Sequence, residues 1–180
     1  MELKAFIISY AGLKEGKHQF QFEVDNTFFE NFGFEEFNSS SIIVDAELDK
    51  KNTIMELSLD ATGSVNVNCD VTNEPFDLDI DTSMNLVVKF GDAFNDDNEE
   101  LLILPHGEYE FNIAQYVYEM LVLSLPHRRV HPGVEDGSLE SDVLDKLDEL
   151  RVSNPEEENN TNITDPRWDA LKKLKTDNNL

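Results

Sequence analysis

The chain has 180 residues and a formal net charge of −24 at pH 7, from 38 acidic and 14 basic residues. This length suits one domain with a real core, and the strong negative field disfavours nonspecific nucleic-acid binding and favours basic partners. A single cysteine excludes an internal disulfide.

The N-terminal residues lack the basic region and apolar core of a secretory signal. No apolar run approaches the ~20 residues that a membrane-spanning helix needs. We therefore expect a cytoplasmic protein that has no membrane association and needs no cofactor.

The first third of the chain predicts two strands and a short helix. Residues 3–9 and 18–24 have apolar residues at strand spacing. The aromatic-rich segment 26–37 predicts a helix that Asn26 or Thr27 caps and Gly33 ends.

Residues 41–90 alternate between apolar and polar side chains with a period of two, which is typical of half-buried strands. The runs 41–49, 55–61, 63–69 and 76–90 predict an antiparallel meander, and the turn 69–76 predicts a hairpin. The outward residues are largely Asp, Glu, Ser and Asn, so we expect one solvated face and one packed face. Such a meander could also close into a barrel-like sheet.

The second half predicts mainly helices. An acidic loop, 91–100, precedes the apolar run 101–104, which we interpret as an edge strand. Asn112 is expected to cap a helix that continues to Leu125 and stops before Pro126. A further amphipathic helix is expected at 141–151.

These elements together predict an α+β fold in three parts. Residues 1–151 form a β-rich globular domain with packed helices, residues 152–165 an acidic flexible linker, and residues 166–180 a C-terminal helix and tail. We find no internal repeat.

Candidate metal sites are weak. Asp77, Asp79 and Asp81 have the spacing of a calcium loop, but Thr82 stands where that loop needs glycine, so we interpret these aspartates as the solvated face of a strand. Structural zinc needs four ligands, usually with several thiolates, and the chain has one cysteine. No nucleophile signature or phosphate-binding glycine loop is present, so we do not expect an enzyme.

Basic residues concentrate late in the chain and are our candidate interaction residues. Two interpretations stay open for the last helix: it contacts a phosphate or an acidic surface of a partner, or its apolar side packs on the protein's own sheet. The candidates are Arg128, Arg129, His131, Arg167, Trp168, Lys172 and Lys173.

Three motifs in this order resemble the YceD family, the large ribosomal RNA subunit accumulation proteins. They are the turn from Cys69 to Phe76, the helix end Leu125-Pro126 followed by Val130-His131, and the terminal motif Asp165-Pro166-Arg167-Trp168 with Leu171-Lys172-Lys173-Leu174. The last motif is similar to that of Bacteroidetes-type members.

Many members of that family carry a C-x-x-C pair and a later histidine or cysteine, suggestive of zinc. In this sequence the corresponding positions are Cys69, Thr72 and His131. Threonine does not replace a thiolate, so we expect vestigial metal positions and no bound metal.

The resemblance implies a non-enzymatic factor that supports the synthesis, processing or stability of large-subunit (23S) ribosomal RNA. Because the chain is so acidic, we expect it to bind a basic ribosomal protein or a large-subunit assembly intermediate, with RNA contact indirect or local. The alternative is a degenerate zinc-type nucleic-acid-binding module.

Overall fold

The computed structural model describes residues 2–98 and 100–150. The chain divides into two compact units, Met1–Ser141 and Asp142–Leu180. The predicted linker 152–165 and terminal helix 166–180 lie outside the described residues, so our division of the chain stays a prediction.

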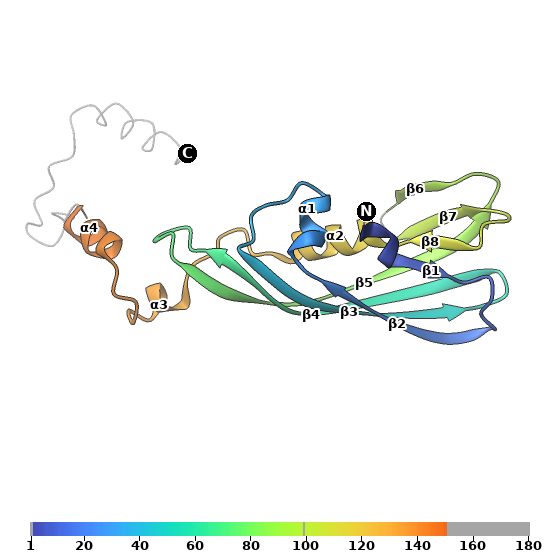
Figure 1. Ribbon diagram of the computed structural model, residues 1–180, viewed down its shortest axis with the longest axis horizontal. Coiled ribbons are helices and arrows are strands. Elements are labelled where there is room, and N and C mark those ends of the chain that lie inside the picture. Colours follow the sequence, from blue (N-terminus) through green and yellow to red (C-terminus); the bar gives the residue numbers. More distant parts are fainter. Residues whose placement is uncertain (1, 99, 151–180) are drawn as a thin grey trace, which may run out of the picture. The chain divides into compact units, whose positions relative to one another are not determined.

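The first unit is built on a six-stranded sheet with the strand order β2-β3-β4-β5-β7-β6 (Figure 1). Strands β2 to β5 form the antiparallel meander that the alternation predicts, and β4 and β5 form the predicted hairpin. The bounds are β2 Gly16–Val24, β3 Ser39–Lys50, β4 Ile54–Asn68, β5 Pro75–Gly91, β6 Asn95–Asn98 and β7 Leu101–Pro105.

The sheet is open, so the idea of a barrel-like closure is wrong. Its edges are β2 and β6, which do not pair with each other. The run 101–104 is also not an edge strand, because β7 lies between β5, to which it is parallel, and β6. All four of these residues are apolar and at least partly buried, as expected for a strand covered on both faces.

A small second sheet and two helices cover the inner face of the large sheet. Strands β1 (Ile7–Ser9) and β8 (Glu110–Asn112) pair antiparallel, and Figure 1 shows them on the same side of the long strands as α1 and α2. Of the strand predicted at residues 3–9, only Ile7–Ser9 is confirmed, because Glu2–Phe6 forms a 3-10 helix. The last residue of this helix, Phe6, packs its ring on Phe22 and Phe28, at centroid distances of 5.3 and 4.7 Å.

Helix α1 (Asn26–Asn31) is capped by Asp25, one residue before the position that we expected. The Asp25 carboxylate accepts the backbone N–H of Phe28 at 3.2 Å. Asn26 bonds elsewhere: its amide donates to the Asn38 carbonyl at 3.1 Å. Gly33 follows the helix end with φ +72°, as predicted for a terminating glycine.

Helix α2 (Ala114–Ser124) confirms the predicted long helix. Asn112 lies one residue before the structural N-cap, yet its side-chain oxygen still accepts the N–H of Ala114 at 2.7 Å. Leu125 is extended because the residue before a proline avoids the helical region.

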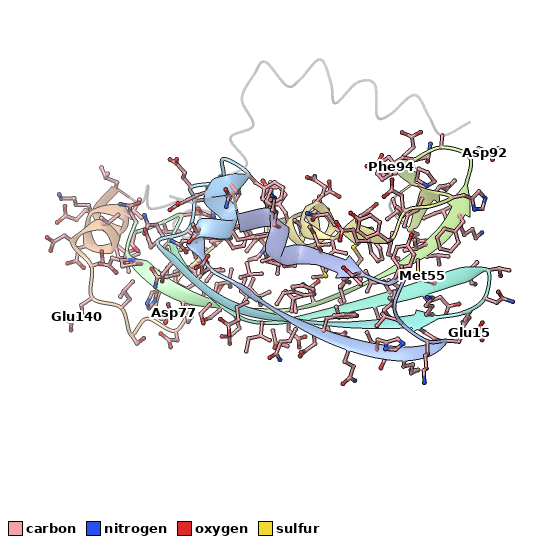
Figure 2. The ribbon with its side chains drawn as sticks, turned by 45° about the vertical axis from the view of Figure 1, so that its right-hand side comes forward. Glu15, Met55, Asp77, Asp92, Phe94 and Glu140 are labelled. Atoms are coloured by element: carbon pink, nitrogen blue, oxygen red, sulfur yellow. The ribbon has the colours of Figure 1, made fainter. Side chains whose placement is uncertain are left out.

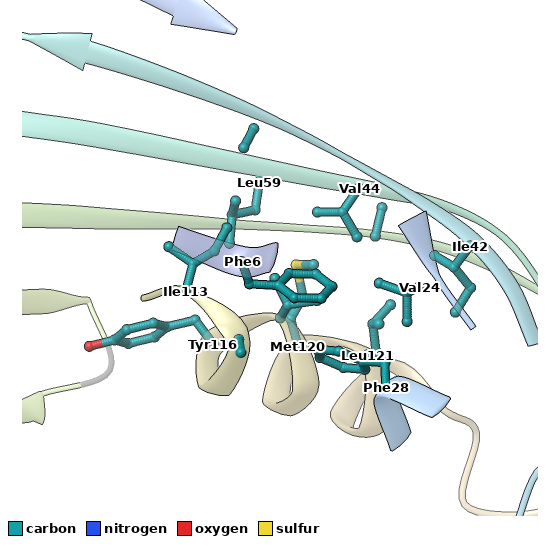
Figure 3. Close-up of a cluster of buried hydrophobic side chains, with 14 of the residues drawn as sticks. Phe6, Val24, Phe28, Ile42, Val44, Leu59, Ile113, Tyr116, Met120 and Leu121 are labelled. Atoms are coloured by element: carbon teal, nitrogen blue, oxygen red, sulfur yellow. The ribbon is translucent and has the colours of Figure 1, made fainter. Parts of the chain in front are cut away.

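The core lies between the sheet and α2 (Figure 3). Inward side chains of the long strands, such as Val44 and Leu59, belong to the same buried cluster as Val117 and Leu121 of the helix, and all four are at most 1% exposed. Burying a side chain of this size contributes roughly 1.5–3 kcal/mol. The alternating sequence therefore sets which face of the sheet the helix covers.

Two short helices follow α2. Helix α3 (Pro132–Glu135) has no counterpart among our predicted elements. In the second unit, α4 (Asp142–Leu150) matches the expected helix at 141–151, apart from its first residue and residue 151, which is outside the described part. None of the helices that are described is long and apolar enough to span a bilayer.

Gly63 provides a test of the close pairing between β3 and β4. Its φ is +155°, and a Cβ built there would lie 2.2 Å from the Ser41 carbonyl oxygen and 2.7 Å from the Ile42 Cα. Because these are backbone atoms, we expect Gly63→Ala to lower the free energy of unfolding by about 2 kcal/mol or more in denaturant titration. The control is Gly12→Ala, because a Cβ built at Gly12 has no atom of the described residues within 4 Å. Equal losses of stability in the two variants would contradict this account.

Candidate functional site

The outer face of the large sheet is acidic. The outward positions of β2, β3, β4 and β5 carry carboxylates, and Figure 2 labels Asp77 among the side chains of this surface. We define the acidic face by residues Glu23, Asp45, Glu47, Asp49, Glu56, Asp60, Asp77, Asp79 and Asp81. The exposure of Asp77, Asp79 and Asp81 confirms that they lie on the solvated side of a strand.

Several of these carboxylates stand next to each other. Asp45 lies directly opposite Asp60, and Asp49 directly opposite Glu56. Like charges in such cross-strand pairs are destabilising. Lys51 relieves the second pair with contacts of 3.7 Å to Asp49 and 2.6 Å to Glu56, whereas the ion pairs of the described residues include none for Asp45 or Asp60.

The turn between β4 and β5 forms a second polar region, which we call the Cys69 corner. The backbone N–H of Cys69 donates to the Glu74 carbonyl, and that of Asn73 to the Cys69 carbonyl, each at 2.8 Å. Asn73 takes a positive φ of 60°, which asparagine tolerates better than most residues. The segment after α2 closes the corner, because the N–H of Asp70 donates to the Arg129 carbonyl at 2.8 Å.

The structure brings Cys69, Thr72 and His131 into this corner. The sulfur of Cys69 accepts the backbone N–H of His131 at 3.3 Å and that of Val71 at 3.5 Å. Burial raises the pKa of the Cys69 thiol, but N–H donation from His131 and hydrogen bonds from Thr72 and Val71 outweigh it, so the pKa lies below its ordinary value. The thiol is 3% exposed and thus poorly accessible.

These three residues do not fit a zinc ion. The Thr72 hydroxyl accepts the N–H of Glu74 at 3.4 Å, and Nδ1 of His131 accepts the N–H of Gly133 at 2.9 Å as the cap of α3. In residues 2–98 and 100–150 no group of three or more His, Cys, Asp or Glu residues is arranged to hold a metal. One thiolate and one imidazole, of which one ring nitrogen already accepts a hydrogen bond, are fewer than the usual four zinc ligands.

Arg129 is an internal bridge rather than a free cation. Its guanidinium Nη1 donates to Glu36 at 2.9 Å, its Nε lies 4.0 Å from the Asp70 carboxylate, and its backbone N–H donates to Asp70 at 2.6 Å. It therefore ties the turn after β4 to the loop after α1 and to the segment after α2. Arg128 next to it is exposed.

Our sequence-based site is thus placed only in part. Its members Cys69, Thr72, Arg129 and His131 lie together at one corner, and Arg167, Trp168, Lys172 and Lys173 lie outside the described residues. Their role in an interaction stays a prediction. Sequence reasoning missed Asp70 and Glu36, which are 59 and 93 residues from Arg129, and no local signal marks such pairs.

The Arg129 bridge predicts unequal effects of two neighbouring arginines on stability. Arg129→Ala removes charged hydrogen bonds of a half-buried side chain, so we expect the free energy of unfolding to fall by about 1 kcal/mol. Arg128→Ala should change it by less than about 0.5 kcal/mol. Denaturant titration of both variants is the measurement, and a larger loss for Arg128→Ala would refute the bridge.

The poor zinc geometry predicts a metal-free protein. Elemental analysis of the chain purified without chelators should find no stoichiometric zinc, and Cys69→Ser should give the same result. Stoichiometric zinc in the unchanged chain, lost in Cys69→Ser, would show that the corner is a working metal site.

Comparison with known proteins found a family for this fold and site. No curated protein and no solved structure matches the chain. The profile of a family described as "Large ribosomal RNA subunit accumulation protein YceD" matches residues 57–175, which include most of β4 and all of β5, the Cys69 corner, α2 and the terminal basic motif. The match covers more than half of the chain, so the protein belongs to the YceD family and has a ribosome-related role.

Proposed function

We propose that this protein is a non-enzymatic, cytoplasmic ribosome-biogenesis factor that supports the synthesis, processing or stability of 23S ribosomal RNA. It acts by binding a basic ribosomal protein, free or within a large-subunit assembly intermediate. The family assignment supports the process, and the acidic face supports the kind of partner.

The observation that carries the proposal is the arrangement of carboxylates on the acidic face. Asp45 and Asp60 face each other, and Asp79 and Asp81 follow on the adjoining strand β5. A sequence under selection for stability alone has no reason to place like charges opposite each other. A basic protein surface would relieve this repulsion and would be steered towards it by the net charge of −24.

Direct binding of RNA backbone is the less favourable route. Phosphates would meet a repulsive field over the acidic face. Arg129 is engaged with Glu36 and Asp70, which leaves Arg128 as the exposed arginine of this pair. RNA contact is therefore local and secondary to the protein contact.

A pull-down from lysate tests this function. The tagged chain is used at low and moderate salt, with and without nuclease, and the eluted proteins are identified. We expect large-subunit ribosomal proteins in the eluate with and without nuclease, and less of them at higher salt. Their absence under every condition would refute the proposal.

A charge-matched pair of variants tests the surface. The face variant carries Asp45→Asn, Asp60→Asn, Asp79→Asn and Asp81→Asn, and we expect it to recover about tenfold less ribosomal protein. The control variant removes as many negative charges from other exposed positions, with Glu15→Gln, Glu30→Gln, Glu140→Gln and Asp142→Asn. Equal losses in both variants would show that only net charge matters and that the acidic face is no docking surface.

A further inference from the structure

A groove between α2 and the strands β7 and β8 lies apart from the acidic face and from the Cys69 corner. The cavity has a volume of about 500 Å³. Its floor is apolar, with Leu102, Leu104 and Phe111 each at most 5% exposed, and Phe94 lines it while remaining 58% exposed. Figure 2 labels Phe94 in the segment that precedes β6.

Tyr116 places an unsatisfied polar group in this groove. The residue is 8% exposed, and its hydroxyl has no hydrogen-bond partner among the described residues. Figure 3 shows the ring beside the buried cluster and the hydroxyl pointing away from it. A buried hydroxyl without a partner costs roughly 1–3 kcal/mol, so its persistence calls for an explanation.

The charges around the hydroxyl indicate which ligand could donate a hydrogen bond to its oxygen. Asp96 and Glu119 line the groove with Tyr116. Burial, with the negative charges of Asp96 and Glu119, raises the pKa of Tyr116 to about 12, so the hydroxyl stays protonated. The groove thus offers neutral and anionic oxygen acceptors side by side, which suits an ammonium or guanidinium group.

The rest of the rim has the same sign. Glu108 and Glu110 also line the cavity, and the described lining residues include no Lys, Arg or His. The Gln115 side-chain amide donates a hydrogen bond to Oε1 of Glu119 at 2.5 Å, and Oε2 of Glu119 accepts no hydrogen bond among the described contacts. An apolar floor under an acidic rim complements a segment that is both apolar and cationic.

We propose that this groove binds an amphipathic, Lys- or Arg-containing segment of a basic protein. An apolar side chain of that segment lies on the floor formed by Leu102, Leu104 and Phe111. Its cationic group lies at Tyr116, Asp96 and Glu119. This inference rests on the proposed function for its choice of a basic protein as partner. It adds a specific site on a different surface from the acidic face. The acidic face attracts the partner at long range, and the groove holds one segment of it.

The test measures binding of a defined peptide to the full chain. The probe is a fluorescent synthetic peptide of about 15 residues with Leu and Trp on one helical face and Lys and Arg on the other. Its affinity is measured by anisotropy at moderate salt for the unchanged chain, Tyr116→Phe, Asp96→Asn/Glu119→Gln and the face variant. A peptide of the same pattern with Glu in place of Lys and Arg is the control probe.

We expect the double variant to weaken binding by about tenfold and Tyr116→Phe by about fivefold. Tyr116→Phe should leave the thermal unfolding temperature of the free protein unchanged or higher, because the lost hydroxyl makes no hydrogen bond to any residue in the described part of the chain. A purely structural role of Tyr116 predicts the opposite, a lower unfolding temperature. The face variant should weaken binding less than the double variant.

Three results would overturn the inference: equal affinity of the peptide for all variants, binding of a labelled RNA oligonucleotide to the chain that Tyr116→Phe weakens, and self-association of the chain that Phe94→Ala abolishes. The first failure is separable from failure of the proposed function. If the peptide binds all variants equally and the double variant still recovers ribosomal proteins from lysate, the groove is not the binding site and the proposed function stands. If the peptide binds as predicted and no ribosomal protein is recovered, the proposed function is wrong, and the groove is still a binding site for amphipathic basic segments.

Discussion

The antiparallel pairing of β4 with β5 continues without a shift from Ile54↔Lys89 to Asn68↔Pro75, and both faces of the protein depend on this register. Side chains alternate across a strand, so one register buries Leu57 opposite Leu86 and exposes Asp60 opposite Ser83. A slip by one residue would turn carboxylates into the core and leucines into water. The same pairing register therefore decides which side chains form the core and which form the acidic face.

Sequence reasoning succeeded where interactions are local. The alternation of 41–90 predicted the meander, and Pro126 and Gly33 predicted two helix ends, because a proline or a positive φ constrains the backbone at that residue. The parallel pairing of β7 with β5 was missed, since the run 101–104 itself says nothing about which strand it joins. Helix α3 was missed although its cap is local, because a helix of four residues is too short to show a helical apolar period.

The candidate site shows the same limit. The motif positions Cys69, Thr72 and His131 were found through resemblance, and the structure places them in one corner. What the sequence could not indicate is that Arg129 is held by carboxylates from two distant segments, or that the Tyr116 hydroxyl has no partner among the residues that the structure describes. Both are properties of three-dimensional packing. A basic residue is available to a partner only if the fold leaves it unpaired. The number of basic residues in a sequence motif therefore overestimates how many of them can contact a partner.

The edge strand β6 has a consequence for solubility. An open sheet leaves backbone donors and acceptors unpaired at its edges, which invites other chains to add strands and aggregate. At β6 the residues Asn95–Asn98 are all exposed, include two aspartates, and pair with β7 in an irregular register. Such a short, charged and irregular strand is a poor template for an incoming strand. At the β6 edge the sheet can therefore stay unclosed without the hazard that an exposed apolar edge strand would bring.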